Sequence, residues 1–378
     1  KNEIALDENG EAIESETTVE EGNVVHIQYD TISFNGIRQA NLESFGKAII
    51  PDYDFSKAKT IVSVGADFMN SWLLSGQYTA QYALGRNPDA KWMNKHFHFE
   101  SNMSISGSNA DVRGMIKPSQ QGEVLSILHK EIVGSALAGV ANTLSENVVA
   151  KVKEAAKELK AQKGHSLLVC GSNEKAMQVV VNSINSALNN YTTTINLNNP
   201  VNLFQSQDDK MSELIKDMNA GNVGAIIMWN TNPVYSHANG ESFKAGLEKV
   251  KLTVDISQYA DETATNCKYV AAENHALESW NDFNPKMSHY AISQPTISPL
   301  FETRSAAESL MTWAGISEYS GKDSTAYYDY MKVMWEKYGF PNQTKYATFK
   351  AYWDNTVHNS CDNEKSPVAL AMPFNGNL

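Results

Sequence analysis

The chain has 378 residues, of which 42% are hydrophobic, and a formal net charge of -12 at pH 7. This length predicts about two domains of roughly 150 residues each, with sizeable cores. The negative charge argues against a nucleic-acid surface, because phosphate binding needs clustered Lys and Arg. Apolar runs such as 165–171 and 225–229 are far shorter than the roughly 20 residues that span a bilayer, so no direct membrane span is expected.

The start of the chain and its cysteines limit what this segment can hold. The sequence begins at Lys1 and continues through an acidic stretch at 7–22, which predicts a fragment of a longer protein. Its three cysteines, Cys170, Cys267 and Cys361, lie far apart without a C-x-x-C pair. We therefore expect no iron–sulfur cluster and no metal site here.

The first part of the chain alternates short β-rich runs with helical stretches, which is typical of parallel βαβ units. Strands are predicted at 59–67 and 92–100. Helices are predicted at 75–85, 124–139 and 147–162. The last of these is charged and amphipathic, and we interpret it as the connection to a second unit.

The second part repeats this pattern. Strands are predicted at 165–171, 192–197, 225–229 and 251–257, and helices at 172–188, 208–221 and 240–250, with Ser172 as an N-cap and Gly221 as a helix end. We therefore expect an α/β fold with two doubly wound, Rossmann-like parallel-sheet halves. Their predicted bounds are 1–160 and 161–320, and a helical appendage follows at 321–378.

Ligands of open α/β sheets bind at the carboxyl ends of the strands, so the turns there are candidate sites. These turns lie at 65–70, 100–111, 171–175, 230–240 and 257–265. None contains a G-x-G-x-x-G, P-loop or G-x-S-x-G motif. A standard dinucleotide site, a P-loop and a nucleophile elbow therefore have no support.

Taken in order, the segments VGAD, E...S...AD, KPSQ, NTNP, DETA and ALESW resemble the successive pterin-guanine-dinucleotide segments of molybdopterin oxidoreductases. The resemblance covers most of residues 40–315. It implies that a nucleotide-contacting turn falls on Asn230, Asn232 and Pro233, and that Glu100 has the matching place in the other half. Further family-matching positions are Asp261, Glu262, His275 and Glu278.

The departures from the family pattern all oppose an anionic ligand. Asp67 and Phe68 replace the polar end of the family's G-S-N-P turn, and the arginine expected shortly after Glu100 is missing. The family's P-G-T-D is 118–121 here, which loses the glycine that permits close backbone approach. Trp280 replaces a glycine after the ALES segment. We interpret the matching positions as vestigial and expect no catalytic residue and no cofactor in this segment.

Longer stretches at 40–72, 230–247 and 261–311 are similar to the molybdopterin-oxidoreductase-like part of the large iron–sulfur subunit of alternative complex III, a quinol-oxidising respiratory assembly. The resemblance implies a scaffold without molybdenum that supports electron transfer, with iron–sulfur clusters outside this segment. It also implies a periplasmic position at the bacterial inner membrane, beside other subunits of a membrane-bound complex. The alternative is a fragment of an active molybdenum bis(pterin guanine dinucleotide) oxidoreductase.

The run HFHFE places His96, His98 and Glu100 on one face of a strand and two phenylalanines on the other. Two imidazoles and a carboxylate could bind a metal ion. No fourth ligand is evident in the sequence, however. Ordinary hydrogen bonding of a buried strand is therefore the preferred interpretation.

The stretch from Asp261 to Asp282 is the densest polar segment. Asp261, Glu262 and Thr263 are expected to cap a helical turn, and 268–275 to form a strand. His275, Glu278 and Asp282 would then lie in the loop beyond it. We expect a hydrogen-bonded loop that joins the two halves, and the alternative is an acid/base pair acting on a small substrate.

The Trp- and Tyr-rich stretch at 324–358 is predicted to serve packing rather than cofactor binding. We expect it to form the surface that contacts a partner subunit, because obligate interfaces are larger and more apolar than ordinary surface. Trp335 and Trp353 would be its anchors.

Overall fold

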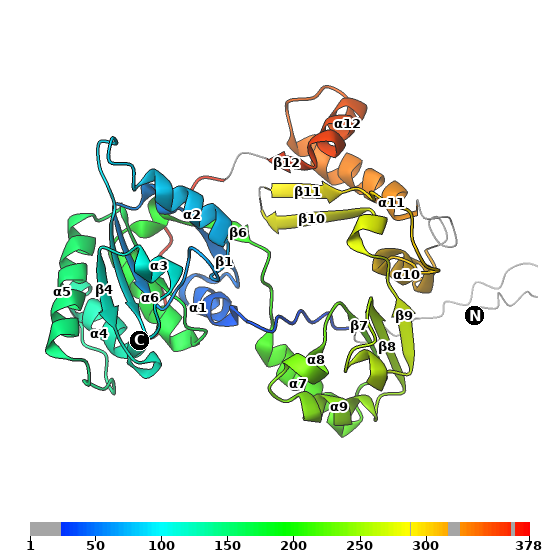
Figure 1. The fold of residues 1–378 in the computed structure, drawn as a ribbon, viewed down its shortest axis with the longest axis horizontal. Helices are drawn as coiled ribbons and strands as arrows, with labels where there is room; N and C mark the ends of the chain where they lie inside the picture. The colour runs from blue at the N-terminus through cyan, green and yellow to red at the C-terminus, as the bar shows by residue number, and fades with distance from the viewer. Residues whose placement is uncertain (1–23, 288, 317–325, 364–366) are drawn as a thin grey trace, which may run out of the picture.

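The computed structural model describes residues 24–287, 289–316, 326–363 and 367–378. Their strands form one four-stranded and one three-stranded parallel sheet, together with a five-stranded antiparallel sheet (Figure 1). We call the surroundings of the four-stranded sheet the first unit and those of the three-stranded sheet the second unit. The third unit contains β10, β11, β12 and the helices α10 to α12.

The first unit is built on the strand order β4-β3-β2-β5. Its strands are β2 (Thr60–Val64), β3 (Lys95–Glu100), β4 (Val112–Met115) and β5 (Ser166–Cys170). Its helices are α1 (Asn35–Phe45), α2 (Ser75–Leu84), α3 (Ile105–Ser108), α4 (Gln121–Ile132), α5 (Glu146–Ala161) and α6 (Lys175–Ala187). Successive strand residues enter opposite cores, since Ile61 packs towards α2 whereas Val62 packs towards α4 and α5.

The second unit has the strand order β7-β8-β9. It comprises α7 (Asp208–Ala220), β7 (Ala225–Trp229), α8 (Pro233–Ser236), α9 (Gly240–Leu247), β8 (Leu252–Ser257) and β9 (Tyr269–Ala272). The core beneath α7 and α9 contains Met218, Met228 and Phe243. On the opposite face, Ile227 and Trp229 are about half exposed. The described helices of this unit thus pack on one face of its sheet.

The third unit joins the first through an antiparallel sheet in the order β1-β6-β10-β11-β12. The strands are β1 (Ile50–Tyr53), β6 (Ile195–Val201), β10 (Asn281–Lys286), β11 (His289–Ser293) and β12 (Cys361–Asn363), and the helices are α10 (Ala306–Trp313), α11 (Ala326–Met334) and α12 (Phe349–Asn359). At the junction Lys286 pairs with Val201, and its Nζ lies 2.5 Å from Asp52 Oδ2. This ion pair is largely buried.

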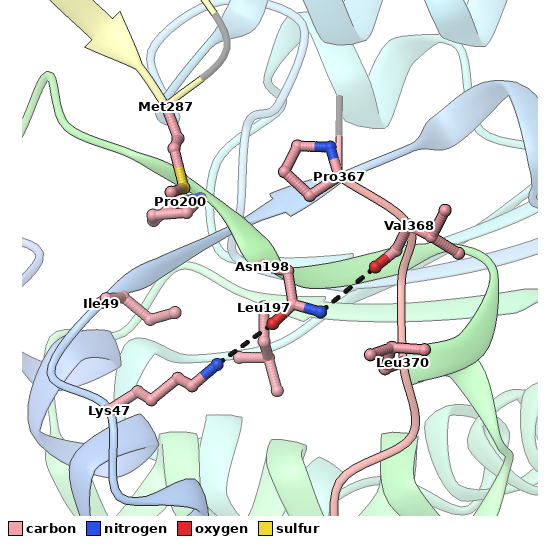
Figure 2. A pocket seen from close by; sticks show the side chains of 9 residues that line it. All are labelled: Lys47, Ile49, Leu197, Asn198, Pro200, Met287, Pro367, Val368 and Leu370. Carbon is pink, nitrogen blue, oxygen red and sulfur yellow. Dashed lines mark hydrogen bonds between the residues drawn. The ribbon is translucent and has the colours of Figure 1, made fainter. Parts of the chain in front are cut away.

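The chain end returns to the first unit and borders an apolar hollow of about 540 Å³. Asn198 Nδ2 donates to the Val368 carbonyl oxygen at 3.1 Å, and Lys47 Nζ donates to Asn198 Oδ1 at 3.1 Å (Figure 2). Beyond the hollow, Met372 and Phe374 pack against the core of the first unit that contains Ile61. Residues 367–378 therefore pack against the first unit.

The predicted α/β class with parallel sheets is confirmed. The expected boundary at residue 160 does not separate the sheets, because β5 pairs with β2 in the first parallel sheet. Strand β6 runs antiparallel to β1 instead of continuing a doubly wound half. No helix among the described residues has both the length and the apolar character needed to cross a bilayer.

Two local expectations differ from the structure for identifiable reasons. The helix predicted at 124–139 ends at Ile132, because Gly134 has φ +93° and leaves the helical conformation. Helix α6 begins at Lys175, so Ser172 is not its N-cap. The Ser172 Oγ nevertheless accepts a hydrogen bond from the Glu174 N–H. Gly221 ends α7 in the left-handed region as predicted.

The prediction that Trp335 and Trp353 anchor a partner interface is wrong, because both side chains are buried. Trp335 is 7% exposed and Trp353 4% exposed, and both pack in a core with Ile292, Met331 and Tyr352. These side chains fill the space between the antiparallel sheet and helices α11 and α12. Residues 324 and 325, with which the stretch begins, lie outside the described residues.

Candidate functional site

The carboxyl ends of β2 and β3 border a polar hollow of about 440 Å³ in the first unit. This is the place at which an open α/β sheet binds its ligand. Its lining includes Gly65, Asp67, Glu100, Ser104 and Gln121. Glu100 is therefore the one predicted site residue that reaches this hollow.

The turn after β2 keeps its backbone N–H groups inside the protein. Gly65 N–H donates to the Phe99 carbonyl oxygen at 2.8 Å, and Ala66 N–H donates to Ser63 Oγ at 3.2 Å. Gly65 has φ +67°, and a Cβ added there would lie 2.6 Å from Gln121 Nε2. The amide of Gln121 thus covers the turn, and these two N–H groups are not available to a phosphate.

Asp67 serves the fold of the same turn. Its Oδ1 accepts hydrogen bonds from the Ser106 N–H at 3.0 Å and from Ser106 Oγ at 2.7 Å. This contact anchors the start of α3 to the turn after β2. The carboxylate also places negative charge on the wall of the hollow.

Glu100 ends β3 and is held by hydrogen bonds from two residues. Arg113 Nε, from β4, donates to Oε1 at 2.6 Å, and the Ser104 N–H donates to both oxygens at 3.3 and 3.1 Å. Burial raises the pKa of Glu100, but the hydrogen bonds from Arg113 and Ser104 outweigh it and hold that pKa below its usual value. Glu100 is thus an ionised carboxylate at neutral pH.

These features decide whether the pterin guanine dinucleotide implied by the resemblance fits. A diphosphate needs free N–H donors or cations. The hollow instead presents two carboxylates, a turn whose amides donate within the protein, and the side chain of Gln121 where the backbone would have to approach. Arg113 is engaged by Glu100. The residues present do not fit the dinucleotide.

The matching turn of the second unit follows β7. Asn230 has φ +50°, and its N–H donates to the Ile256 carbonyl oxygen at 3.2 Å. Asn232 caps α8, and its Nδ2 donates to Glu262 Oε2 at 2.8 Å while its Oδ1 accepts from Thr263 Oγ1 at 2.7 Å. The hydrogen bond from Asn232 lowers the pKa of Glu262. The amide of Asn232 is therefore satisfied within this turn.

Pro233 and Asp261 complete this cluster. Pro233 is the first residue of α8 and is buried, as suits a residue without an N–H at a helix start. Asp261 Oδ1 accepts from the N–H groups of Thr263 and Ala264, both at 2.9 Å. The predicted capping by Asp261 is confirmed.

His275 and Glu278 cap each other after β9. His275 Nδ1 accepts from the Leu277 N–H at 3.1 Å, and Glu278 Oε2 accepts from the His275 N–H at 2.8 Å. Glu278 Oε1 also accepts from the Leu300 N–H at 3.0 Å, and these two backbone hydrogen bonds lower its pKa. The geometry is that of a capping box, so both side chains serve the loop.

Asp282 shows what this loop connects. Its oxygens accept from the Tyr327 hydroxyl at 2.7 Å and from Trp335 Nε1 at 3.0 Å. Both partners belong to the third unit. The loop was expected to join the two α/β halves, but Asp282 ties it to the third unit instead, because β10 begins at Asn281 and carries Asp282 under α11.

We predict that H275A lowers the stability of this loop only modestly. The substitution removes one cap acceptor, which typically costs about 1 kcal/mol. Hydrogen exchange of the Leu277 amide should accelerate, whereas exchange in β7 and β8 should not change. Global unfolding by H275A would instead make His275 part of a larger network.

The structure places the predicted site residues in three separate clusters. Glu100 lies in the first unit, the Asn230 and Glu262 turns meet in the second, and His275 with Glu278 forms the loop after β9. Sequence reasoning missed Gln121 and Arg113. Gln121 is the last residue of the 118–121 segment that was compared with P-G-T-D, whereas nothing in the sequence linked Arg113 to Glu100.

The HFHFE face is arranged for hydrogen bonding. His96 Nε2 lies 3.4 Å from His98 Nδ1, so these ring nitrogens face each other rather than a common point. The described residues contain no group of three His, Cys, Asp or Glu side chains that could hold a metal ion. Phe97 and Phe99 enter the opposite core, as the alternation predicts.

Comparison with known proteins identifies the fold. No protein-family model matches the chain. Acetylene hydratase from Pelobacter acetylenicus superposes with a TM-score of 0.60 and 13% identity, over 89% of this chain and 56% of the hydratase chain. The chain has a molybdopterin oxidoreductase-like fold. The formyltransferase/hydrolase complex from Methylorubrum extorquens superposes with a TM-score of 0.45 and 13% identity, over 74% of this chain and 80% of that chain.

One sequence relative adds a functional context for the molybdopterin oxidoreductase-like fold. The molybdopterin-binding-like subunit of menaquinone reductase from Nitratidesulfovibrio vulgaris is 32% identical over 95 residues, which is 24% of this chain. The aligned part spans only 14% of that relative's length. This part of the chain is thus distantly similar to a subunit of a menaquinone reductase.

Proposed function

We propose that this chain is a cofactor-free, molybdopterin-oxidoreductase-like scaffold module of a respiratory oxidoreductase that exchanges electrons with quinol. Its role is to hold subunits together and to support electron transfer between groups carried elsewhere. Iron–sulfur clusters would lie outside this segment. No step of the redox chemistry is assigned to its own side chains.

The hollow at the ends of β2 and β3 is the observation that carries this proposal. In a fold of this type the position would receive a dinucleotide, but Asp67 and Glu100 line it and Gln121 covers Gly65. Bringing a diphosphate beside these carboxylates would cost several kcal/mol in a partly buried site, on the order of the Coulomb energies expected there. In this proposal Asp67, Glu100 and Gln121 contact the protein itself at the place where the dinucleotide would lie.

The relative in menaquinone reductase supports the assignment to a respiratory assembly, since that protein is by name one subunit of a larger enzyme. By the same reasoning we propose other subunits of a membrane-bound complex as the partners. The proposed location is the periplasmic side of the bacterial inner membrane, with attachment through those subunits.

We expect the isolated protein to carry neither molybdenum nor pterin, even after expression with molybdate in a host that makes the cofactor. Elemental analysis and fluorescence of oxidised pterin after acid release measure both. A molybdenum enzyme purified from the same culture is the positive control. Near-stoichiometric molybdenum with two pterins per chain would replace this proposal with the alternative, a fragment of an active molybdenum oxidoreductase.

A further inference from the structure

A line of polar side chains runs under the first parallel sheet and ends at the hollow. The Tyr82 hydroxyl, from α2, lies 3.3 Å from His96 Nδ1, and His96 Nε2 lies 3.4 Å from His98 Nδ1. His98 Nε2 in turn lies 3.2 Å from Glu100 Oε2. Alternation along β3 places these three residues on one face, so the line is a direct consequence of the strand.

The middle of the line is closed to water, and only its two end residues keep slight exposure. His96 and His98 are 0% exposed, Tyr82 is 3% exposed and Glu100 is 4% exposed. Burial is the main cause that lowers the pKa of both histidines, and His96 reaches about 3. Both imidazoles are therefore neutral at pH 7, and each has one donor nitrogen and one acceptor nitrogen.

Charged groups flank the two ends. At the His96 end, Arg86 just after α2 and Asp111 just before β4 form an ion pair at 2.9 Å, and Asp111 Oδ2 accepts from the His96 N–H at 2.8 Å. At the Glu100 end, Arg113 from β4 pairs with the carboxylate, and Asp67 from the turn after β2 acts on His98. These pairs keep net charge away from the middle of the line.

One arrangement of protons suits an ionised Glu100. His98 Nε2–H then points at Glu100, His96 Nε2–H donates to His98 Nδ1, and the Tyr82 hydroxyl donates to His96 Nδ1. Every donor is directed towards the hollow. In this state the Asn109 carbonyl oxygen, 3.1 Å from the Tyr82 oxygen, has no proton from Tyr82.

The opposite arrangement holds one proton more. Tyr82 donates to the Asn109 carbonyl oxygen, His96 Nδ1–H donates to Tyr82, His98 Nδ1–H donates to His96 Nε2, and Glu100 is a neutral acid that donates to His98 Nε2. A shift of one proton along each link converts the first arrangement into a protonated Glu100 and a tyrosinate. A proton taken up from solvent at Tyr82 then completes the second arrangement, so all atoms balance.

We propose that the line Tyr82–His96–His98–Glu100 transfers a proton between the surface at Asn109 and the hollow. Asn109 is exposed, and Glu100 lines the hollow, so the line runs along β3 from the His96 end, beside Asn109, to the hollow at the carboxyl end of the strand. Glu100 is the group that gains or loses the proton inside the hollow. This function is independent of whether a partner subunit or a small molecule lies there.

The contact between His98 and Glu100 is the controlled step of this line. His98 Nε2 is 3.2 Å from the carboxylate, but among the described residues it has no hydrogen-bond partner in good alignment. Rotation of the Glu100 carboxylate would align the contact. Arg113 and Ser104 restrain that rotation through their hydrogen bonds to the carboxylate.

The test measures exchange of the His98 ring proton with water, by NMR on the full chain labelled with nitrogen-15 in histidine. In Y82F this exchange should slow at least about ten-fold, equivalent to about 1.4 kcal/mol in the barrier. H96F, which interrupts the line in its middle, should have the same effect. The spectra of the backbone amides show whether each variant is folded.

Y78F is the matched control, because Tyr78 is a fully buried tyrosine of the same helix outside the line. Its His98 exchange should equal that of the wild type. Unchanged exchange in both folded variants, Y82F and H96F, would overturn the proposal, since the proton would then reach His98 through the hollow. Equal slowing in Y78F would also overturn it, because general packing would then set the rate.

Discussion

Substituting Trp335 with glutamate should unfold the third unit while the two parallel sheets stay folded. The indole is 7% exposed, and its Nε1 donates to Asp282 Oδ2 at 3.0 Å. Truncating a buried tryptophan costs about 3–5 kcal/mol, and a buried carboxylate without a cation adds to that. Asp282 would also meet a second negative charge. W353E should have the same outcome, since Trp353 belongs to the same core.

Limited proteolysis with mass spectrometry measures this effect. We expect new cleavage sites in α11 and α12 and none in β2 or β8. Y338E is the control, because Tyr338 lies in the same helical segment as Trp335 but is 59% exposed. If W335E remained as resistant to protease as Y338E, the side chain would not be a core residue, and the original expectation of a docking surface would return.

The tryptophans illustrate what local sequence patterns can and cannot predict. An aromatic stripe identifies residues that will be buried, but the pattern is the same whether the covering surface is the chain itself or a partner. Here strand β11 covers the two tryptophans, because it pairs with β10 in an antiparallel hairpin that packs against α11 and α12. That hairpin depends on contacts between residues far apart in the sequence.

Features governed by local chemistry were predictable. The alternation of HFHFE placed His96 and His98 on one face, and the structure confirms it. Gly221 ends α7 because glycine adopts a positive φ without strain. Asp261 caps the turn after β8 because its carboxylate reaches two N–H groups. Each of these depends on residues within a few positions of one another.

Features that depend on strand order were not predictable from those patterns. The sequence predicts a strand at 165–171, but its pairing with β2 follows from packing among α4, α5 and α6. The same holds for the hollow, where Gln121 meets Gly65 and Arg113 meets Glu100 only after β4 has aligned with β3. Charge in a site can therefore come from a strand that carries no motif.

Acidification below about pH 6.5 should destabilise the first unit, and H96F should weaken that dependence. Burial lowers the pKa of His96 to about 3 in the folded protein, whereas an unfolded histidine has a pKa of about 6.5. Between these values the unfolded chain binds a proton that the folded chain does not. The free energy of unfolding therefore falls as the pH falls, by about 1.4 kcal/mol for each pH unit.

The loss of stability due to His96 is absent above about pH 6.5 and grows as the pH falls towards about 3. The pKa of His98 is lowered in the same direction, mainly by burial, so it adds to the slope. Carboxylates with lowered pKa, such as Glu100 and Asp111, also lose stability on acidification, but only below the unfolded carboxyl values of about 4. The window between about pH 4.5 and 6.5 thus isolates the histidines.

Urea unfolding followed by the amide NMR signals of β2 and β3 gives the slope for the first unit. H96F removes one titrating group, so its slope between about pH 4.5 and 6.5 should be smaller by about 1.4 kcal/mol per pH unit, whatever its stability at pH 7. H165Q is the control, because His165 is an exposed histidine of the same unit that lies outside the buried line. A slope in H96F equal to that of the wild type would mean that His96 gains its proton in the folded protein, and the buried line would then carry charge at mildly acidic pH.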